Sequence, residues 1–128
     1  METIIIFVVS IYKQNYVNMR KFRTIFMEDV ADFFVEINEN AQEKILYNID
    51  KAEQGNDPEL FKKLTNEIWE FRTKYGNLQY RLFAFWDKRD KMDTLVVCSH
   101  GIIKKTDKVP SKEISKAEKL RTYYFDNQ

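Results

Sequence analysis

The chain contains one cysteine, one histidine and three glycines among its 128 residues, and these scarcities exclude several kinds of site. Because Cys98 has no second cysteine to pair with, an internal disulfide is excluded, and the chain fits a reducing compartment such as the cytoplasm. A single thiol and a single imidazole do not make a zinc site, so we expect no bound metal. The three glycines lie far apart, which excludes a glycine-rich phosphate-binding loop.

Long apolar runs are also missing. The stretch IIIFVVSI at residues 4–11 is too short to cross a bilayer, which needs about 20 apolar residues. It has no basic segment before it and no small-residue cleavage motif after it, so we expect neither a signal peptide nor a membrane partner. Met19 opens MRKFRTIF, a natural first strand. We therefore predict an N-terminal appendage over residues 1–18 and a single domain over residues 19–128.

The charge is nearly balanced overall but unevenly distributed. Residues 1–60 hold six Lys or Arg against eleven Asp or Glu, whereas residues 61–128 hold fifteen against nine, so the net charges are −5 and +6. A basic C-terminal half predicts a polyanionic or acidic partner for that half. Chance segregation of charges on a soluble surface would give the same counts, so the charges alone leave both interpretations open.

Hydrophobic periodicity predicts a helical hairpin and a set of strands. Apolar residues recur at helical spacing after Glu28 and again after Asn40, which we expect to cap the second helix, with Gly55 ending it. A helical turn is expected from Pro58, and Ser111 is expected to cap a last helix. Alternating residues and intervening turns predict strands at residues 21–26, 68–72, 79–86 and 94–103. The order β-α-α-β-β-β-α implies an α+β fold: a small antiparallel-rich sheet with an N-terminal helical hairpin and a C-terminal helix.

The last three strands and the last helix bring basic and aromatic residues together. The expected cluster consists of Arg72 and Arg81 on neighbouring strands, His100, Lys104 and Lys105 on or after the third, and Tyr123 and Tyr124 in the helix. Such cations could stabilise the charge that develops when an RNA 2′-hydroxyl attacks its own phosphate, and the rings could stack on a base. Each residue also has a structural interpretation: a buried, satisfied histidine, an arginine paired with Glu70 or Glu67, solvated lysines at a strand end, and tyrosines that close the core.

Four segments carry a resemblance to a known family: WEFR at 69–72, QYRLFAFW at 79–86, SHGIIKKT at 99–106 and VPSKEISKAEK at 109–119. From about Met19 to about Tyr124, the chain resembles the RelE/ParE toxin superfamily, and within it the HigB-like, phage-derived branch. The resemblance implies a RelE-like fold and a toxin of a type II toxin–antitoxin pair that cleaves messenger RNA on the ribosome without a metal or cofactor. The implied partners are a cognate antitoxin, expected to be a small helix-turn-helix protein, the ribosome and mRNA.

The resemblance also assigns roles to individual residues. The positions that match the family's catalytic residues are Arg72, Arg81, His100 and Lys104, and the expected RNA contacts are Lys105, Lys108, Tyr123 and Tyr124. Residues 100 and 104 are an even number apart, so their side chains share a face if the strand is unbroken, whereas a bulge at Gly101 would separate them. A ParE-like gyrase inhibitor and a catalytically inactive antitoxin-binding relative remain as alternatives. The net charge of +1 departs from the strongly basic composition usual in the superfamily.

Overall fold

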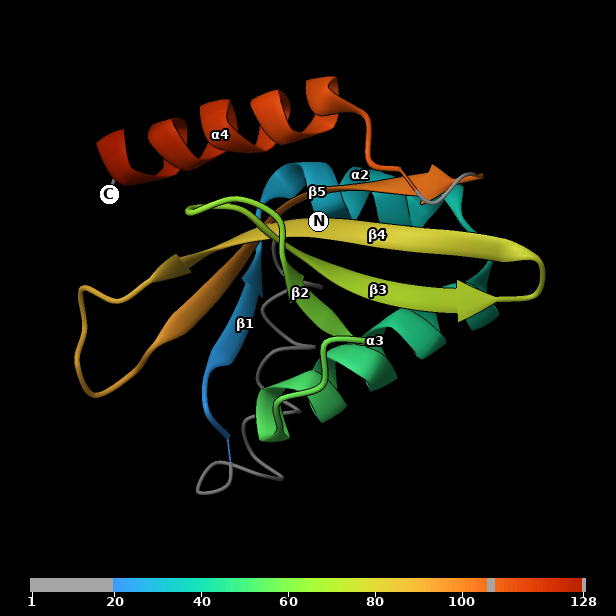
Figure 1. Ribbon diagram of the computed structural model, residues 1–128, viewed down its shortest axis with the longest axis horizontal. Helices are drawn as coiled ribbons and strands as arrows, with labels where there is room; N and C mark the ends of the chain where they lie inside the picture. Colours follow the sequence, from blue (N-terminus) through green and yellow to red (C-terminus); the bar gives the residue numbers. More distant parts are fainter. Residues whose placement is uncertain (1–19, 106–107, 128) are drawn as a thin grey trace.

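The computed structural model describes residues 20–105 and 108–127, and the predicted appendage at residues 1–18 lies outside them. The elements follow in the order β1 (Arg23–Phe26), α2 (Glu28–Glu36), α3 (Glu39–Gln54), β2 (Phe61–Lys63), β3 (Trp69–Tyr75), β4 (Leu78–Asp87), β5 (Leu95–Lys104) and α4 (Ser111–Asp126). The strands form a five-stranded mixed sheet in the order β1-β5-β4-β3-β2 (Figure 1). β1 is parallel to β5, and the other neighbouring strands are antiparallel. The predicted α+β fold is confirmed.

Local sequence signals explain the helix starts, with two corrections. Glu28 opens an acidic first turn in α2, where negative charge is favourable. The cap of α3 is Asn38, whose side chain accepts a hydrogen bond from the Asn40 amide at 2.7 Å, so the prediction that Asn40 caps this helix is wrong by two residues. α4 begins at Ser111 as expected, but the capping position is Pro110, because the serine already lies within the helix.

The sheet contains one strand that the periodicity did not predict. The residues after Pro58 form a turn, as expected, but Phe61 then begins β2, which pairs with β3 at the edge of the sheet. The Phe61 ring stacks on Phe71 of β3, with the ring centroids 4.4 Å apart. A strand of three residues is too short to leave a periodic signal, so only its pairing with β3 reveals it.

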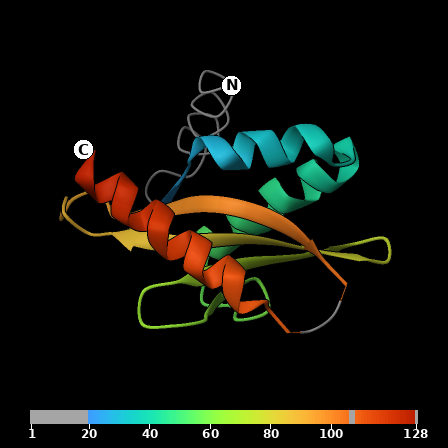
Figure 2. The ribbon, with the colours of Figure 1, turned by 90° about the horizontal axis from the view of Figure 1, so that it is seen from above.

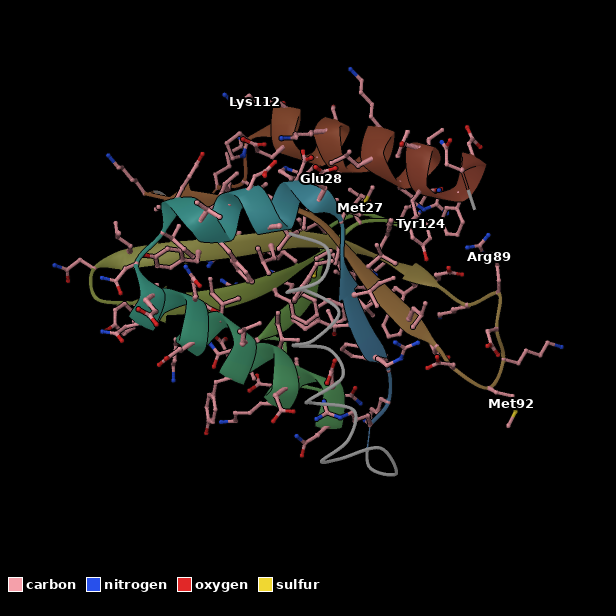
Figure 3. All side chains as sticks on the ribbon, turned by 180° about the vertical axis from the view of Figure 1, so that it is seen from behind. Met27, Glu28, Arg89, Met92, Lys112 and Tyr124 are labelled. Atoms are coloured by element: carbon pink, nitrogen blue, oxygen red, sulfur yellow. The ribbon has the colours of Figure 1, made fainter. Side chains whose placement is uncertain are left out.

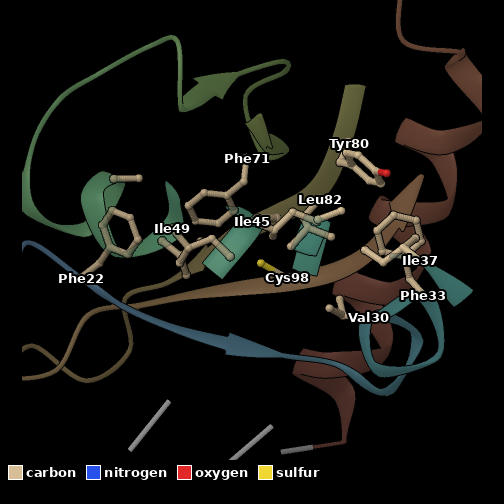
Figure 4. Packing of buried hydrophobic residues seen from close by; sticks show 14 residues of the cluster. Phe22, Val30, Phe33, Ile37, Ile45, Ile49, Phe71, Tyr80, Leu82 and Cys98 are labelled. Atoms are coloured by element: carbon tan, nitrogen blue, oxygen red, sulfur yellow. The ribbon is translucent and has the colours of Figure 1, made fainter. Parts of the chain in front are cut away.

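The two faces of the sheet carry separate hydrophobic cores. Helices α2 and α3 pack on one face, and α4 packs on the other (Figures 1 and 2). Alternate residues of β4 divide between them: Leu82 and Ala84 belong to the first core, whereas Phe83 and Phe85 belong to the second. Cys98 lies within the first core (Figure 4), and burial raises the pKa of its thiol, which keeps it unreactive.

A β-bulge in β5 decides which face its C-terminal residues occupy. Phe83 of β4 pairs with His100, whereas the next residue of β4 pairs with Cys98, so Ser99 is the extra residue of the bulge. Without the bulge, the even spacing of residues 98 and 100 would direct His100 into the first core. With it, the His100 ring stacks on Phe83, on the α4 side. The bulge precedes both His100 and Lys104, so the common face predicted for these two residues is confirmed.

Gly101 lies where β5 passes close to α2. A Cβ added at Gly101 would lie 2.7 Å from both Leu82 Cδ2 and Phe33 Cε2. We expect Gly101→Ala to lower the free energy of unfolding by about 1 to 3 kcal/mol, because these side chains must shift to admit the methyl group. Gly55→Ala is the control, since nothing lies within 4 Å of its added Cβ. Urea denaturation measures both, and equal midpoints for the two variants would contradict the close packing at Gly101.

Candidate active site

The four residues predicted to be catalytic lie on one face of the sheet. Arg72 and Arg81 are directly opposite each other in the β3–β4 ladder. The β4–β5 ladder pairs His100 with residue 83 and Lys104 with residue 79. Since residues 79, 81 and 83 alternate onto the same side of β4, all four side chains share the face on which α4 packs.

A buried carboxylate holds the two arginines. Glu70 is 3% exposed, and its Oε1 lies 3.2 Å from Arg81 Nε while its Oε2 lies 3.7 Å from Arg72 Nε. Arg81 is 2% exposed and also donates hydrogen bonds to Gln79 Oε1 at 2.6 Å and to the Tyr80 carbonyl at 3.2 Å. The negative charge of Glu70 offsets the repulsion between the two guanidinium groups and keeps both at one place on the sheet.

The two-residue alternation of side chains along a strand could have placed Glu70 in the site from the sequence alone. Glu70 precedes Arg72 by two residues in β3, so their side chains must share a face. Of the two carboxylates considered as partners of Arg72 in the sequence, Glu70 is therefore the one that pairs with it. Glu67 pairs instead with Arg121 of α4 at 3.4 Å. We call Glu70, Arg72, Arg81 and Lys104 the arginine–lysine cluster.

His100 is closed off from solvent in this structure. It is 2% exposed, its Nδ1 lies 3.0 Å from Ser99 Oγ, and its Nε2 lies 3.1 Å from Glu113 Oε1. Burial lowers the pKa of His100 and so favours the neutral imidazole, although the hydrogen bond to Glu113 opposes the shift. In the neutral ring with its proton on Nε2, Nε2–H donates to Glu113 and Nδ1 accepts from the Ser99 hydroxyl, which otherwise donates to the Phe83 carbonyl at 3.3 Å. The structure therefore matches the interpretation of His100 as a buried and satisfied side chain.

Glu113 had no signal in the sequence that could connect it with the histidine. It lies in the first turn of α4 and reaches His100 because this helix packs against β5. The two residues belong to different elements, and no spacing rule relates a helix position to a strand position. Only the docking of α4 brings them together.

The predicted lysines divide between the buried face and the surface. Lys104 ends β5 and is 5% exposed on the face that it shares with Arg81. Lys105 is exposed beyond the end of this strand, and Lys108 is exposed just ahead of α4. Lys104 is thus placed with the arginines, whereas the other two lysines are available to a partner that binds from outside.

The two predicted tyrosines lie on different sides of α4. Tyr123 is 61% exposed, whereas Tyr124 is buried and donates a hydrogen bond to Asp87 Oδ2 at 2.9 Å. Hydrogen bonds from Arg89 hold the pKa of Asp87 at about 2, and burial raises the pKa of Tyr124 to about 12. The hydrogen bond of Tyr124 joins the C-terminal part of α4 to the end of β4. Lys112 lies at the opposite end of this helix (Figure 3). The structure gives Tyr124 a packing role, and an RNA contact from this pair is left to Tyr123.

A comparison with protein families places the chain. The model described as "Phage derived protein Gp49-like (DUF891)" matches residues 32–122, a range that contains the arginine–lysine cluster, His100 and Glu113. The chain belongs to this family. Gp49-like proteins are associated with the toxins of toxin–antitoxin systems and belong to the RelE/HigB-like superfamily, which confirms the resemblance at the level of the superfamily. Searches of curated proteins and of solved structures found no match.

The Gp49-like site offers cationic groups on a rigid sheet. Guanidinium groups can hold two phosphate oxygens at once, and an ammonium group adds a compact positive charge. Within residues 20–105 and 108–127, no group of three or more His, Cys, Asp or Glu side chains could hold a metal ion. The helices in the same ranges are all too short or too polar to cross a membrane.

Proposed function

We propose that this Gp49-like protein is the toxin of a type II toxin–antitoxin pair and belongs to the HigB-like branch, acting as a ribosome-dependent mRNA endoribonuclease in the cytoplasm. The observation that carries the proposal is the arginine–lysine cluster, in which Arg72, Arg81 and Lys104 share one face of the sheet. Family membership supports the role of toxin, and the cluster supports the chemistry of phosphodiester cleavage. The proposed catalytic domain spans residues 19–128, and the reaction needs no metal or cofactor.

The proposed reaction uses the 2′-hydroxyl of the RNA as the nucleophile. Its oxygen attacks the adjacent phosphorus and loses its proton, the bond from phosphorus to the 5′-oxygen breaks, and the leaving oxygen gains a proton. The guanidinium groups of Arg72 and Arg81 bind the phosphoryl oxygens, where negative charge increases in the transition state. Lys104, on the same face, donates the proton to the leaving oxygen.

His100 is the proposed proton acceptor, and its use requires a movement of α4. Burial favours the neutral imidazole, the form that can accept a proton, but its Nε2 is hydrogen-bonded to Glu113. When the first turn of α4 moves away, Nε2 loses this hydrogen bond and the ring proton shifts to Nδ1, which donates to Ser99 Oγ; Nε2 then presents its lone pair to the 2′-hydroxyl. Glu113 would then control access to the base, and the ribosome would supply the geometry of the substrate.

Induction of the protein alone in a bacterial host tests the function. Mapping of mRNA 5′ ends should show cuts in phase with codons, while DNA stays intact. DNA damage that depends on gyrase would instead identify a ParE-like inhibitor, and the absence of both effects would identify an inactive antitoxin-binding relative. The antitoxin, expected to be a small helix-turn-helix protein, should prevent the cuts when it is expressed together with the toxin.

The two adjacent lysines should differ in their effect on cleavage. We expect Lys104→Met to reduce it by about 10²-fold, because the ammonium group on the Arg81 face is lost while the volume of the stem is kept. The matched variant Lys105→Met should retain most of the activity, since Lys105 is exposed beyond the strand end. Quantified mRNA ends give the ranking, and circular dichroism checks both folds. A larger loss in the Lys105 variant would place the reacting phosphate outside the cluster.

A further inference from the structure

The exposed lysines of α4 lie on one flank of the helix, apart from its other exposed polar residues. Lys112, Lys116, Lys119 and Tyr123 are all exposed and follow one another at intervals of four, three and four residues, so they form one line along the helix. We call this line the lysine ridge. The other exposed flank of α4 carries Ser111, Ser115, Glu118 and Thr122. The helix thus presents an unbroken row of cations and one ring on a single flank.

The lysine ridge lies away from the arginine–lysine cluster. The inner side of α4 carries Glu113, bonded to His100, together with the buried Ala117 and Tyr124. Lys112 extends outward at the start of the helix (Figure 3). At a rise of 1.5 Å per residue, the ridge is about 16 Å long. A partner bound to the ridge therefore contacts the outer side of α4 and not the sheet face that carries the cluster.

Acidic side chains border the ridge. α2 carries Glu28, Asp29, Asp32 and Glu36, and Lys116 Nζ lies 3.4 Å from Asp29 Oδ2, with both side chains about half exposed. The Asp29 carboxylate therefore flanks the ridge at Lys116, and further carboxylates follow along the same helix. A broad anionic surface, such as a membrane, would also meet the carboxylates of α2. A narrow chain of negative charges would meet the lysines alone.

We propose that the lysine ridge binds the phosphate backbone of a base-paired RNA. The ridge has no aliphatic anchor of the kind found at the centre of a protein interface, whereas a phosphate backbone needs only cations placed along it. A single ring, Tyr123, is too few for a single strand, which is held by stacking several bases in succession. The choice of RNA over DNA rests on the proposed function, in which the toxin works on the ribosome and must be positioned there.

The test compares two matched charge reversals in the full chain. Lys112→Glu/Lys119→Glu changes the ridge, and Lys44→Glu/Lys51→Glu changes α3 by the same charge at the same seven-residue spacing. Lys44 and Lys51 are exposed, and the ammonium group of each lies over the Tyr47 ring, so the control also matches the combination of lysines with a tyrosine. The ligand is an RNA hairpin whose stem exceeds one helical turn, and binding is followed by fluorescence anisotropy between about 50 and about 200 mM salt.

We expect the ridge variant to bind the hairpin at least about tenfold more weakly and to lower the salt slope by about 2, one for each lost phosphate contact. The α3 variant should bind as the wild type does. The corresponding Lys→Gln pairs repeat the comparison without charge reversal, and thermal unfolding checks that each variant is folded. Equal weakening in the two helices would mean that only net charge matters and would overturn the proposal.

Further outcomes separate RNA from its competitors. If the wild type bound a DNA duplex of the same length as tightly as the hairpin, the assignment to RNA would be rejected. The assignment would also be rejected if the ridge variant lost binding to anionic vesicles while its binding to the RNA hairpin stayed unchanged. The ridge and the nuclease can also fail independently. Ridge-dependent RNA binding without mRNA cleavage rejects the proposed function but not the ridge, whereas cleavage without ridge-dependent binding rejects the ridge alone.

Discussion

Arg81→Lys should lower mRNA cleavage by roughly 10²- to 10³-fold while the protein remains folded. The substitution keeps a positive charge beside Glu70 but removes the planar group that binds two phosphate oxygens at once. Loss of a donor that acts in the transition state reduces a rate by about this factor. Mapping of mRNA ends after induction measures the change, and thermal unfolding followed by circular dichroism checks the fold.

Lysine is the informative replacement because Arg81 is 2% exposed. Alanine would leave Glu70 buried with Arg72 as the nearby guanidinium at 3.7 Å, and removal of one partner of a buried ion pair is strongly destabilising. Loss of toxicity in that variant would therefore report loss of folding. Arg121→Lys is the control, since Arg121 pairs with Glu67 at the surface, and it should retain activity. Full toxicity of Arg81→Lys would reject a catalytic role for this guanidinium.

Glu70→Ala should lower the free energy of unfolding by about 3 kcal/mol or more. Glu70 is 3% exposed and lies within 4 Å of both arginines, so its removal leaves two guanidinium groups facing each other across β3 and β4. Like charges at directly opposite positions in a ladder repel each other, and the loss of the side chain also leaves a cavity. Urea denaturation measures the effect.

A matched carboxylate and a double variant give the Glu70 experiment its controls. Glu67→Ala removes an exposed carboxylate that also pairs with an arginine, and it should change stability by less than about 1 kcal/mol. Glu70→Gln/Arg81→Met removes both charges and should recover part of the stability lost in Glu70→Ala, because no uncompensated charge remains between these two positions. A Glu70→Ala variant as stable as Glu67→Ala would show that the buried carboxylate does not hold the arginines together.

Much of the fold could be predicted because its signals are local. The strands around Phe71, Leu82 and Val97 alternate or run apolar for five residues or more, and the helices carry apolar residues at helical spacing. Turn residues such as Gly76, which has a positive φ of 61°, mark the hairpin between β3 and β4. The short strand β2 and the capping role of Asn38 were missed, since three residues are too few for a period and two asparagines compete for one cap.

The site was predictable only in part. Arg72, Arg81 and Lys104 were identified from their positions and from the family resemblance, and the strand ladders place them on one face. The burial of Arg81 and Lys104 was not foreseen, nor was the pairing of Arg81 with Glu70. Tyr124 shows the same limit, because its partner Asp87 lies 37 residues away in the sequence. The exposure of a side chain and its hydrogen-bond partners depend on which elements pack together. The spacing of residues along one element does not predict them.

The sequence by itself determined the order of the helices and of the longer strands, the alternation of side chains along each of these strands, and the lysine line on α4, because these depend on the period of a single segment. Only the tertiary structure decided that β1 joins β5 in parallel, that the extra residue in β5 is Ser99, and that α4 brings Glu113 to His100. The physical reason is that each of these features joins segments distant in sequence. The free energy that stabilises them comes from apolar surface buried in the two cores, and which surface is buried depends on how the helices pack on the sheet.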